Sequence, residues 1–367
     1  MGKINNLSRE IRRKIAAALF DKRRKYKKDL DIKNSKSFLL LLPDDKIGDM
    51  VINTLSFREI KKLYPELKIL VLCGKNSAEI IKYNPNIDEV LEIYGKFQKD
   101  FAIYKDLRKR KIDIALDLYE FDLKPLRLLS LRIIAPHFLI GLHKKKYKTF
   151  DFSIEGYFFD KHITQRHRCL LNVLGIENPS LNYDVFIGAE EEKAAQEYIQ
   201  KAQDKIMIVV NPFAASKHRS FEFEKLKELI SLIKNSFDCA VFILCPQNKR
   251  AGIAPLENEN EKIFICSFKS ILSAAALIEK SALIISPDTS IVHIASAFQK
   301  KTIALYLDFS NRQEKTDIIW GPNNPNAFII NVDSQKGLLK NDIYNIANSQ
   351  IIEAAKYLLR RQNCRNE

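Results

Sequence analysis

Residues 37 to 73, SFLLLLPDDKIGDMVINTLSFREIKKLYPELKILVLC, carry the pattern that decides the fold. The continuous apolar runs at 37–42 and 67–73 predict strands that are buried on both faces. The stretch 49–65 between them has the apolar spacing of a helix. A strand, a helix and a strand in this order predict a βαβ unit with parallel strands.

The same alternation continues along both halves of the chain. Further strands are expected at 88–94, 112–118, 205–211, 238–245, 262–266, 282–286 and 301–307. Further helices are expected at 75–84, 98–111, 123–134, 221–235, 271–281, 290–298 and within 341–362. The pattern loosens at 146–203, which we interpret as the end of one domain and the passage to the next.

The sequence therefore predicts an α/β protein with two Rossmann-like domains. Such domains place a ligand cleft between them, at the carboxyl ends of their strands. The predicted segments are a basic amphipathic helix at 1–36, a first domain at 37–183, a second domain at 184–344 and a C-terminal helix at 345–367.

The composition excludes several classes of protein. Of the 367 residues 46% are hydrophobic, which favours a globular protein over a disordered one. No apolar window is long enough for a membrane-spanning helix, and the first residues do not resemble a secretory signal. The six cysteines form no CxxC pair, which favours free thiols in a reducing cytoplasm.

The net charge of +15 is concentrated at the N-terminus, where residues 1–36 contain 13 Lys or Arg against four Asp or Glu. Leu7, Ile11, Ile15 and Leu19 recur every four residues and predict one apolar stripe on a basic helix. Such a helix suits an anionic membrane surface. The alternative is a helix that packs on the body of the protein. Nucleic acid is not expected as a partner, because interleaved aromatic residues and a nucleic-acid module are missing.

The loop after the first strand is unusually charged, with Asp44, Asp45, Lys46 and Asp49 around Gly48. A structural turn needs a glycine and one helix cap, but not this many charges. We interpret Gly48 as the residue that permits a tight turn. Asp49 then stands at the start of a helix.

A second polar stretch is ALIISPDTSIVHIASAF at 282–298. Asp288, Thr289 and Ser290 precede a helix, and each has a side chain that caps helices. The N-terminus of this helix would suit a diphosphate, because free N–H groups and the positive end of the helix dipole lie there. An ordinary capped helix with a half-buried His293 is the alternative.

A third stretch is VVNPFAASKHRSFEFEKLKEL at 209–229. A small-residue loop ends at Ser216, and the cations from Lys217 to Arg219 precede a helix. Loop amides followed by cations suit phosphate oxygens, although a solvated basic loop has the same composition. The glycine-rich dinucleotide and P-loop motifs are absent, as is any His and Cys spacing typical of zinc.

Together these stretches resemble the family 9 glycosyltransferases, the lipopolysaccharide heptosyltransferases. KIGDMVINTLSFREIKKLYPELKILVL with the later YNPNIDEVLEI resembles their N-terminal signature, and RKIDIALDLYEFDLKPLRLLSL resembles the stretch on their sugar side. SPDTSIVHIASAF is similar to their D-T-G-x-x-H-x-A-x-A motif. NPFAASKHRSFEFEKLKEL is similar to their loop with a Lys or Arg before the second-domain helix. The resemblance runs from about residue 37 to about residue 335.

The resemblance implies a GT-B fold, with the donor on the second domain and the acceptor on the first. Asp49 would be the general base, and Lys217 would bind the donor phosphates. The other implied or candidate donor-binding residues are Ser216, Arg219, Asp288, Thr289, Ser290 and His293. The candidate acceptor-binding residues are Lys46, Gly48, Lys124 and Arg127.

The implied activity is an inverting transfer of a heptose from a nucleotide-diphosphate sugar, expected to be ADP-heptose. The acceptor would be lipid A-Kdo or the core oligosaccharide, at the cytoplasmic face of the inner membrane. No metal cofactor is expected. The sequence departs from the family at Ser290, where the family has glycine, and in the loop 306–326. Open alternatives are another hexose donor, a nucleotide-sugar epimerase and a non-catalytic membrane-associated binding protein.

Overall fold

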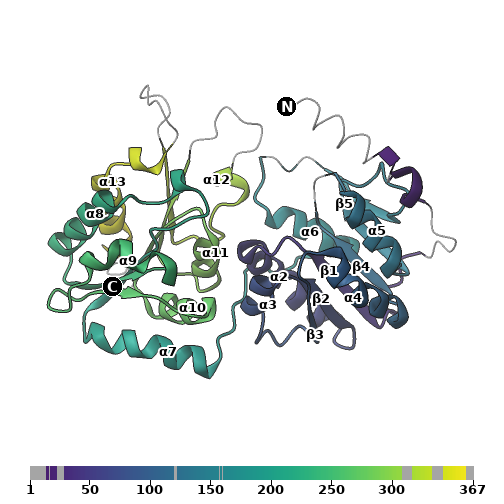
Figure 1. Cartoon of the computed structure of the whole chain (residues 1–367), viewed down its shortest axis with the longest axis horizontal. Coiled ribbons are helices and arrows are strands. Elements are labelled where there is room, and N and C mark those ends of the chain that lie inside the picture. Colours follow the sequence, from purple (N-terminus) through teal and green to yellow (C-terminus); the bar gives the residue numbers. More distant parts are fainter. Residues whose placement is uncertain are drawn as a thin grey trace.

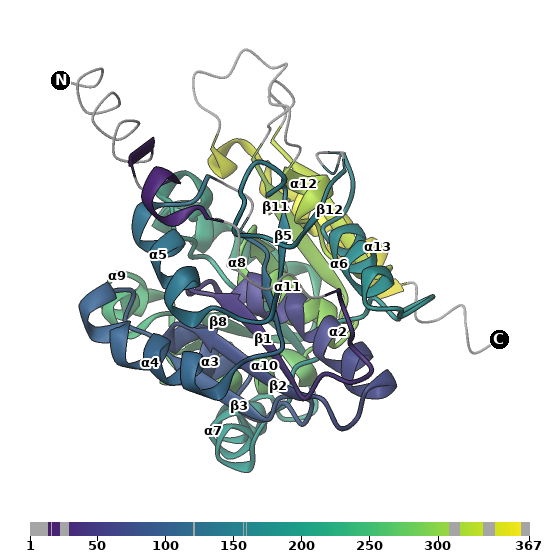
Figure 2. The ribbon, with the colours of Figure 1, turned by 90° about the vertical axis from the view of Figure 1, so that its right-hand side faces the viewer.

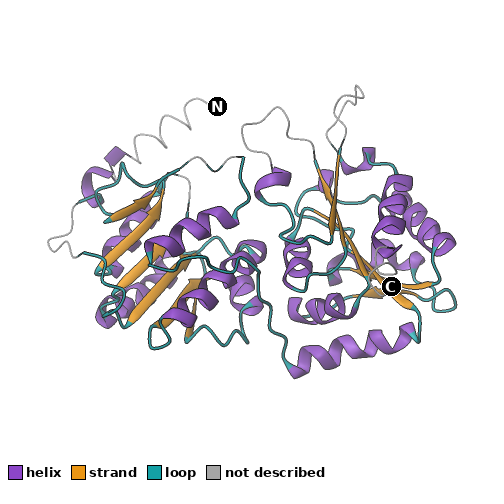
Figure 3. Ribbon diagram, turned by 180° about the vertical axis from the view of Figure 1, so that it is seen from behind, coloured by secondary structure: helices purple, strands orange, loops and turns teal. Residues whose placement is uncertain are grey.

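Two parallel sheets of six strands each form the frame of the molecule (Figures 1 and 3). The structure is a computed structural model that describes residues 14–15, 17–22, 29–119, 122–156, 158, 160–307, 316–332 and 342–360. Each sheet belongs to its own α/β domain, and the two domains lie side by side (Figure 1). The predicted fold class of two Rossmann-like parallel-sheet domains is therefore confirmed.

The first sheet has the strand order β3-β2-β1-β4-β5-β6. Its strands are β1 (Ser37–Leu42), β2 (Lys68–Cys73), β3 (Glu89–Glu92), β4 (Ile114–Asp117), β5 (Phe138–Leu142) and β6 (Phe152–Ile154). Its helices are α2 (Ile47–Leu63), α3 (Lys75–Ile80), α4 (Phe97–Arg110), α5 (Pro125–Ile134) and α6 (Thr164–Val173). Alternate residues of β1 face opposite layers: Phe38 and Leu40 pack with α2, whereas Leu39 and Leu41 pack with α4 and α5.

The second sheet has the order β12-β11-β10-β7-β8-β9. Its strands are β7 (Ile206–Val210), β8 (Cys239–Leu244), β9 (Ile263–Cys266), β10 (Leu283–Pro287), β11 (Thr302–Tyr306) and β12 (Ala327–Asn331). Its helices are α7 (Ala189–Ile199), α8 (Phe223–Ser236), α9 (Arg250–Ile253), α10 (Ile271–Lys280), α11 (Ser290–Ala297), α12 (Thr316–Ile319) and α13 (Asn348–Arg360). In both domains the first strand lies beside the fourth, which is the switch point where ligands bind in such sheets.

The structure adds elements that the sequence analysis did not predict. Strands β5 and β12 were not expected, and the region read as a passage between domains contains β6, α6 and α7. Of the predicted N-terminal stripe, Leu7 and Ile11 lie outside the described residues, as does the part 308–315 of the loop 306–326. Among the described residues, no helix has both the length and the apolar character that crossing a bilayer requires. The five described cysteines are free thiols.

The two domains meet through helices α2 and α11 (Figure 1). One apolar cluster runs across this contact and includes Met50 and Val51 of α2 and Ile291 and Ile294 of α11. A Cβ atom on Gly48 would lie 2.9 Å from Cδ2 of His293. The absence of a side chain at Gly48 therefore lets the two helices approach this closely.

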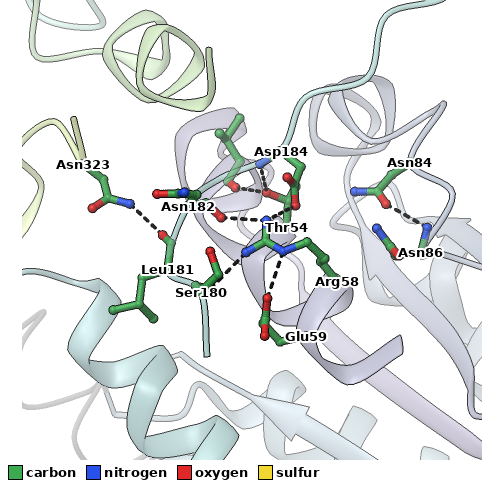
Figure 4. Close-up of polar contacts among 11 residues, drawn as sticks. Thr54, Arg58, Glu59, Asn84, Asn86, Ser180, Leu181, Asn182, Asp184 and Asn323 are labelled. Carbon is green, nitrogen blue, oxygen red and sulfur yellow. Dashed lines mark hydrogen bonds and ion pairs between the residues drawn. The ribbon is translucent and has the colours of Figure 1, made fainter. Parts of the chain in front are cut away.

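The segment 180–184, which joins the domains, is fixed to the side of α2 (Figure 4). Arg58 donates hydrogen bonds to the backbone oxygens of Ser180 (3.0 Å) and Asn182 (2.9 Å). The backbone N–H of Asp184 donates to Oγ1 of Thr54 at 2.9 Å. Helix α2 thus contacts both the joining segment and helix α11. These contacts fix the orientation of the second domain relative to the first.

We expect the substitution Gly48→Ala to lower the free energy of unfolding. The added methyl group overpacks against His293, which costs about 1–3 kcal/mol, more than the ~1 kcal/mol that alanine gains over glycine in a helix. Urea unfolding followed by the fluorescence of Trp320, the only tryptophan, measures the change. Gly252→Ala in α9 is the matched control, because a Cβ there meets nothing within 4 Å. Equal stability of the two variants would contradict the role given to Gly48.

Candidate active site

The turn between β1 and α2 is made by Asp45 and not by Gly48. Asp45 has a φ of 51°, whereas Gly48 is not among the residues with positive φ. The Asp45 carboxylate accepts hydrogen bonds from the backbone N–H of Ser77 and from Nδ2 of Asn76, both at 2.8 Å. It thereby caps helix α3 from outside the helix. The interpretation of Gly48 as the turn residue was wrong, because aspartate also tolerates the left-handed conformation.

Asp49 lies in the first turn of α2, beside the carboxyl end of β1. Its side chain is 28% exposed, and Nζ of Lys46 lies 3.8 Å from Oδ2. Burial raises the pKa of Asp49. The positive charge of Lys46 lowers this pKa, and the negative charge of Asp44 raises it further. A carboxylate with a raised pKa holds a proton more tightly and is a better general base.

Arg166 on α6 is a residue near Asp49 that the sequence analysis missed. Its side chain is 5% exposed, and its charge favours the ionised form of Asp49 and so lowers the pKa of that carboxyl. The guanidinium lies 5.8 Å from the ring centre of Phe158. Arg166 sits in the stretch that was read as a passage between domains, so no local pattern pointed to it.

At the switch point of the second domain, Asn211 connects the ends of two neighbouring strands. Its Nδ2 donates to Oγ of Ser286 at 3.0 Å and to Oγ1 of Thr289 at 3.1 Å. Thr289 is the N-cap of α11, and its Oγ1 accepts from the backbone N–H of Ile291 at 3.3 Å. Ser290 begins the helix. These contacts fix the helix N-terminus at the carboxyl edge of the sheet.

The loop before α8 faces the same helix end. Nη1 of Arg219 lies 2.8 Å from Oδ2 of Asp288 and 3.2 Å from its backbone oxygen. Burial raises the pKa of Asp288, and Arg219 works against this. Nε of Arg219 lies 3.5 Å from Oγ of Ser216. The side chain of Lys217 is 85% exposed, and its Nζ lies 4.0 Å from Oε1 of Glu222. Arg219 therefore holds the loop in place, while the ammonium of Lys217 extends into solvent.

His293 is buried between the domains. Burial, with the charge of His162 as a further cause, lowers its pKa to about 4, so the ring is neutral at pH 7. Within the described residues its Nδ1 has no hydrogen-bond partner, and the ring meets Tyr183 edge to face with 6.2 Å between the ring centres. The structure thus places His293 against Gly48 of the first domain, one turn inside α11.

The two remaining candidates, Lys124 and Arg127, lie on the other side of β1. Lys124 is exposed and is the N-cap residue of α5. Nε of Arg127 lies 3.0 Å from Oδ2 of the fully buried Asp117, and the guanidinium lies 4.7 Å from the ring centre of Tyr119. Both residues line a cavity of about 240 Å³. Among the residues that the structure describes, no cluster of three or more His, Cys, Asp or Glu could hold a metal ion.

Comparisons with known proteins indicate the family to which the chain belongs. The sequence profile described as "Glycosyltransferase family 9 (heptosyltransferase)" matches residues 101–342. The chain is 28% identical to "Putative lipopolysaccharide heptosyltransferase 4" of Escherichia coli K12, over 78% of this chain and 79% of that protein.

Solved structures show the same fold. The family 9 glycosyl transferase of Veillonella parvula DSM 2008 superposes with a TM-score of 0.75 at 17% identity, covering 90% of this chain and 99% of that one. The E. coli ADP-heptose LPS heptosyltransferase II superposes with a TM-score of 0.69 at 14% identity, and the match covers 89% of this chain and 99% of that one.

Proposed function

Because the chain belongs to glycosyltransferase family 9 and is therefore a glycosyltransferase, we propose that it transfers a heptose from ADP-heptose to the inner core of lipopolysaccharide. The names of the similar proteins support heptose, ADP and lipopolysaccharide as the substrates. The observation that carries the proposal is the contact of Gly48 with His293. It brings Asp49 and the N-terminus of α11 to the same place, where the carboxyl ends of both sheets meet.

In the proposed reaction Asp49 takes the proton of an acceptor hydroxyl. The hydroxyl oxygen attacks the anomeric carbon of the heptose, and the bond from that carbon to the diphosphate oxygen breaks. The diphosphate leaves with the electron pair, and the configuration at the anomeric carbon inverts. Burial raises the pKa of Asp49 and so makes its carboxylate a stronger base.

The leaving diphosphate gains negative charge, and groups of the second domain would stabilise it. The first N–H groups of α11 and the ammonium of Lys217 are the proposed partners of its oxygens. Ser216, Asp288, Thr289 and Arg219 would hold this region in shape, with Arg219 bound to Asp288 at 2.8 Å. These cationic and N–H groups suit a reaction without a metal ion, which we propose here.

A different nucleotide-hexose donor is the remaining rival function, whereas membership of the family speaks against the epimerase and the non-catalytic binding protein that the sequence left open. One assay distinguishes all of them. A transferase consumes its donor much faster when an acceptor is added, whereas an epimerase converts a nucleotide sugar without one. A binding protein does neither. Measuring the release of ADP from ADP-heptose, with and without a core oligosaccharide, separates these classes. UDP-glucose serves as the competing donor.

We also propose that the protein works as a peripheral protein on the cytoplasmic face of the inner membrane. The described part of the N-terminal helix lies beside α5 (Figures 1 and 2). Asp21 accepts hydrogen bonds from the backbone N–H (2.8 Å) and Oγ1 (2.9 Å) of Thr149, and Phe20 packs on the core. Ile15 and Leu19 nevertheless stay 55% and 56% exposed. The helix is thus attached to the body and still presents two apolar side chains, which supports contact with lipid.

The first test concerns Asp49 as the base. Asp49→Asn keeps the shape and removes the basicity, so turnover should fall by roughly 10²–10⁴-fold while ADP binding stays unchanged. Turnover of the wild type should fall at low pH, as Asp49 becomes protonated. Lys46→Ala removes a charge that lowers the pKa of Asp49, so this fall should begin at a higher pH. Rates of ADP release across pH measure both effects, and near-normal turnover of Asp49→Asn would exclude it as the base.

The second test concerns the donor phosphates. Lys217→Ala should weaken ADP binding by roughly 10–100-fold, the range for a hydrogen bond to a charged group. Lys227→Ala, which removes an exposed cation from α8, is the matched control and should leave the affinity unchanged. Calorimetry measures both, and repeating it in EDTA should give the same affinities. Equal binding by the two variants would place the phosphates elsewhere, and loss of binding in EDTA would mean that a metal takes part.

The third test concerns the membrane. The wild type should sediment with anionic vesicles at low salt and be released at high salt, because salt screens the basic helix. The double substitution Ile15→Ser and Leu19→Ser should weaken binding at least ~10-fold, because each apolar side chain contributes about 1.5–3 kcal/mol when buried. Leu63→Ser changes an exposed leucine on α2 and is the control. If both variants bind as the wild type does, the helix does not contact lipid.

A further inference from the structure

A cavity of about 240 Å³ lies between helices α4 and α5, at the carboxyl ends of β1 and β2. Its wall is largely apolar, and its apolar residues include Leu41, Leu72, Ile93, Phe97, Leu131 and Ile134. The volume is below the ~300 Å³ at which ordinary ligand clefts begin. The cavity therefore has room for one small group rather than for a whole nucleotide.

Asp100 of α4 lines this cavity, and the residue is 1% exposed. Oδ1 accepts a hydrogen bond from the backbone N–H of Tyr94 at 2.8 Å. Oδ2 is buried and has no hydrogen-bond partner among the described residues. A buried carboxylate oxygen without a donor is costly. A ligand that brings a hydrogen-bond donor would remove this cost.

The cations at the cavity do not make it a site for anions. Arg127 is already paired with Asp117, and Lys124 stands exposed at the edge. Asp44, in the loop after β1, also lines the cavity. Because Asp117 neutralises Arg127, the carboxylates of Asp44 and Asp100 face one remaining cation, Lys124, so the cavity keeps an excess of one negative charge, which disfavours a carboxylate or a phosphate.

We propose that this cavity binds a neutral, hydroxyl-bearing sugar ring of the acceptor and discriminates against an acidic one. The inference rests on the proposed function and specifies its acceptor: a neutral core sugar rather than Kdo, which carries a carboxylate. The carboxylates accept hydroxyl protons in charge-assisted hydrogen bonds. The aromatic residues Phe97, Tyr104 and Tyr119 offer apolar surface to the C–H groups of the ring.

The cavity also lies next to the proposed base. Asp44 raises the pKa of Asp49 and also that of Arg127, so its charge acts on both the base and the cavity wall. A sugar ring held between α4 and α5 would thus have its edge beside the loop that leads into α2. Asp49 is the first carboxylate after that loop.

The experiment measures binding without a donor, by saturation-transfer NMR with the methyl glycosides of a neutral heptose and of Kdo. We expect the wild type to bind the neutral glycoside at least tenfold more tightly. Asp100→Asn and Asp44→Asn should each reduce this preference at least threefold. Asp106→Asn is the matched control, because Asp106 lies on the same helix α4 and pairs with Arg110 outside the cavity. Among the residues that the structure describes, Asp44 makes no hydrogen bond or ion pair, so Asp44→Asn remains informative if Asp100→Asn fails to fold.

Equal or tighter binding of the Kdo glycoside by the wild type would overturn the inference, as would an unchanged preference in Asp44→Asn. Other outcomes distinguish a failure of the proposed function from a failure of the cavity assignment. If the neutral glycoside binds as expected but ADP-heptose is not consumed with any acceptor, the cavity assignment stands and the transfer of heptose does not. If ADP-heptose is consumed with a Kdo-terminated acceptor and not with a heptose-terminated one, the transferase stands and the cavity assignment is wrong.

Discussion

The approach of α11 to α2 at Gly48 is the constraint on which the rest of the site depends. A side chain at Gly48 would occupy space taken by the ring of His293. The ring is buried and neutral, since burial lowers the pKa of His293 to about 4. A charged ring would be unfavourable near the positive end of a helix dipole. A small residue on one helix and an uncharged ring on the other therefore set the distance between the two halves of the site.

Sequence reasoning recovered the well-buried strands β1 and β8 and also the less buried β3. Strands such as β1 and β8 are covered on both faces and read as unbroken apolar runs. Strand β12 was missed because it lies at the edge of its sheet, where Phe328 and Ile329 are 40% and 38% exposed. Strand β5 was missed for another reason. It contains Gly141, whose missing side chain makes room for Phe150, 2.4 Å from the position a Cβ would take. The glycine interrupts an otherwise apolar, buried run, and the contact that requires it lies nine residues further along the chain.

The same distinction applies to the candidate site. Thr289 was predicted as a cap from local rules, and the structure shows it as the N-cap of α11. Asn211 bonds to a residue 78 positions away, and Arg166 acts on Asp49 from a different helix. Neither relation has a sequence signal within one element. The assignment of the turn to Gly48 failed because glycine is the usual left-handed residue, whereas here the carboxylate of Asp45 is held by α3 and fixes the turn.

The charge of the loop 44–49 has a physical explanation once its three carboxylates are separated. Asp45 is satisfied by donors of α3, so it serves the fold. In the described part of the chain Asp44 has no hydrogen bond or ion pair, and the side chain of Asp49 has only an ion pair of 3.8 Å with Lys46, whose side chain is 64% exposed. Two close carboxylates destabilise each other, and this repulsion together with burial raises the pKa of Asp49. The position of these two carboxylates at the carboxyl edge of the first sheet suits the proposed base for an acceptor hydroxyl, because the same repulsion that costs stability increases the affinity of Asp49 for a proton.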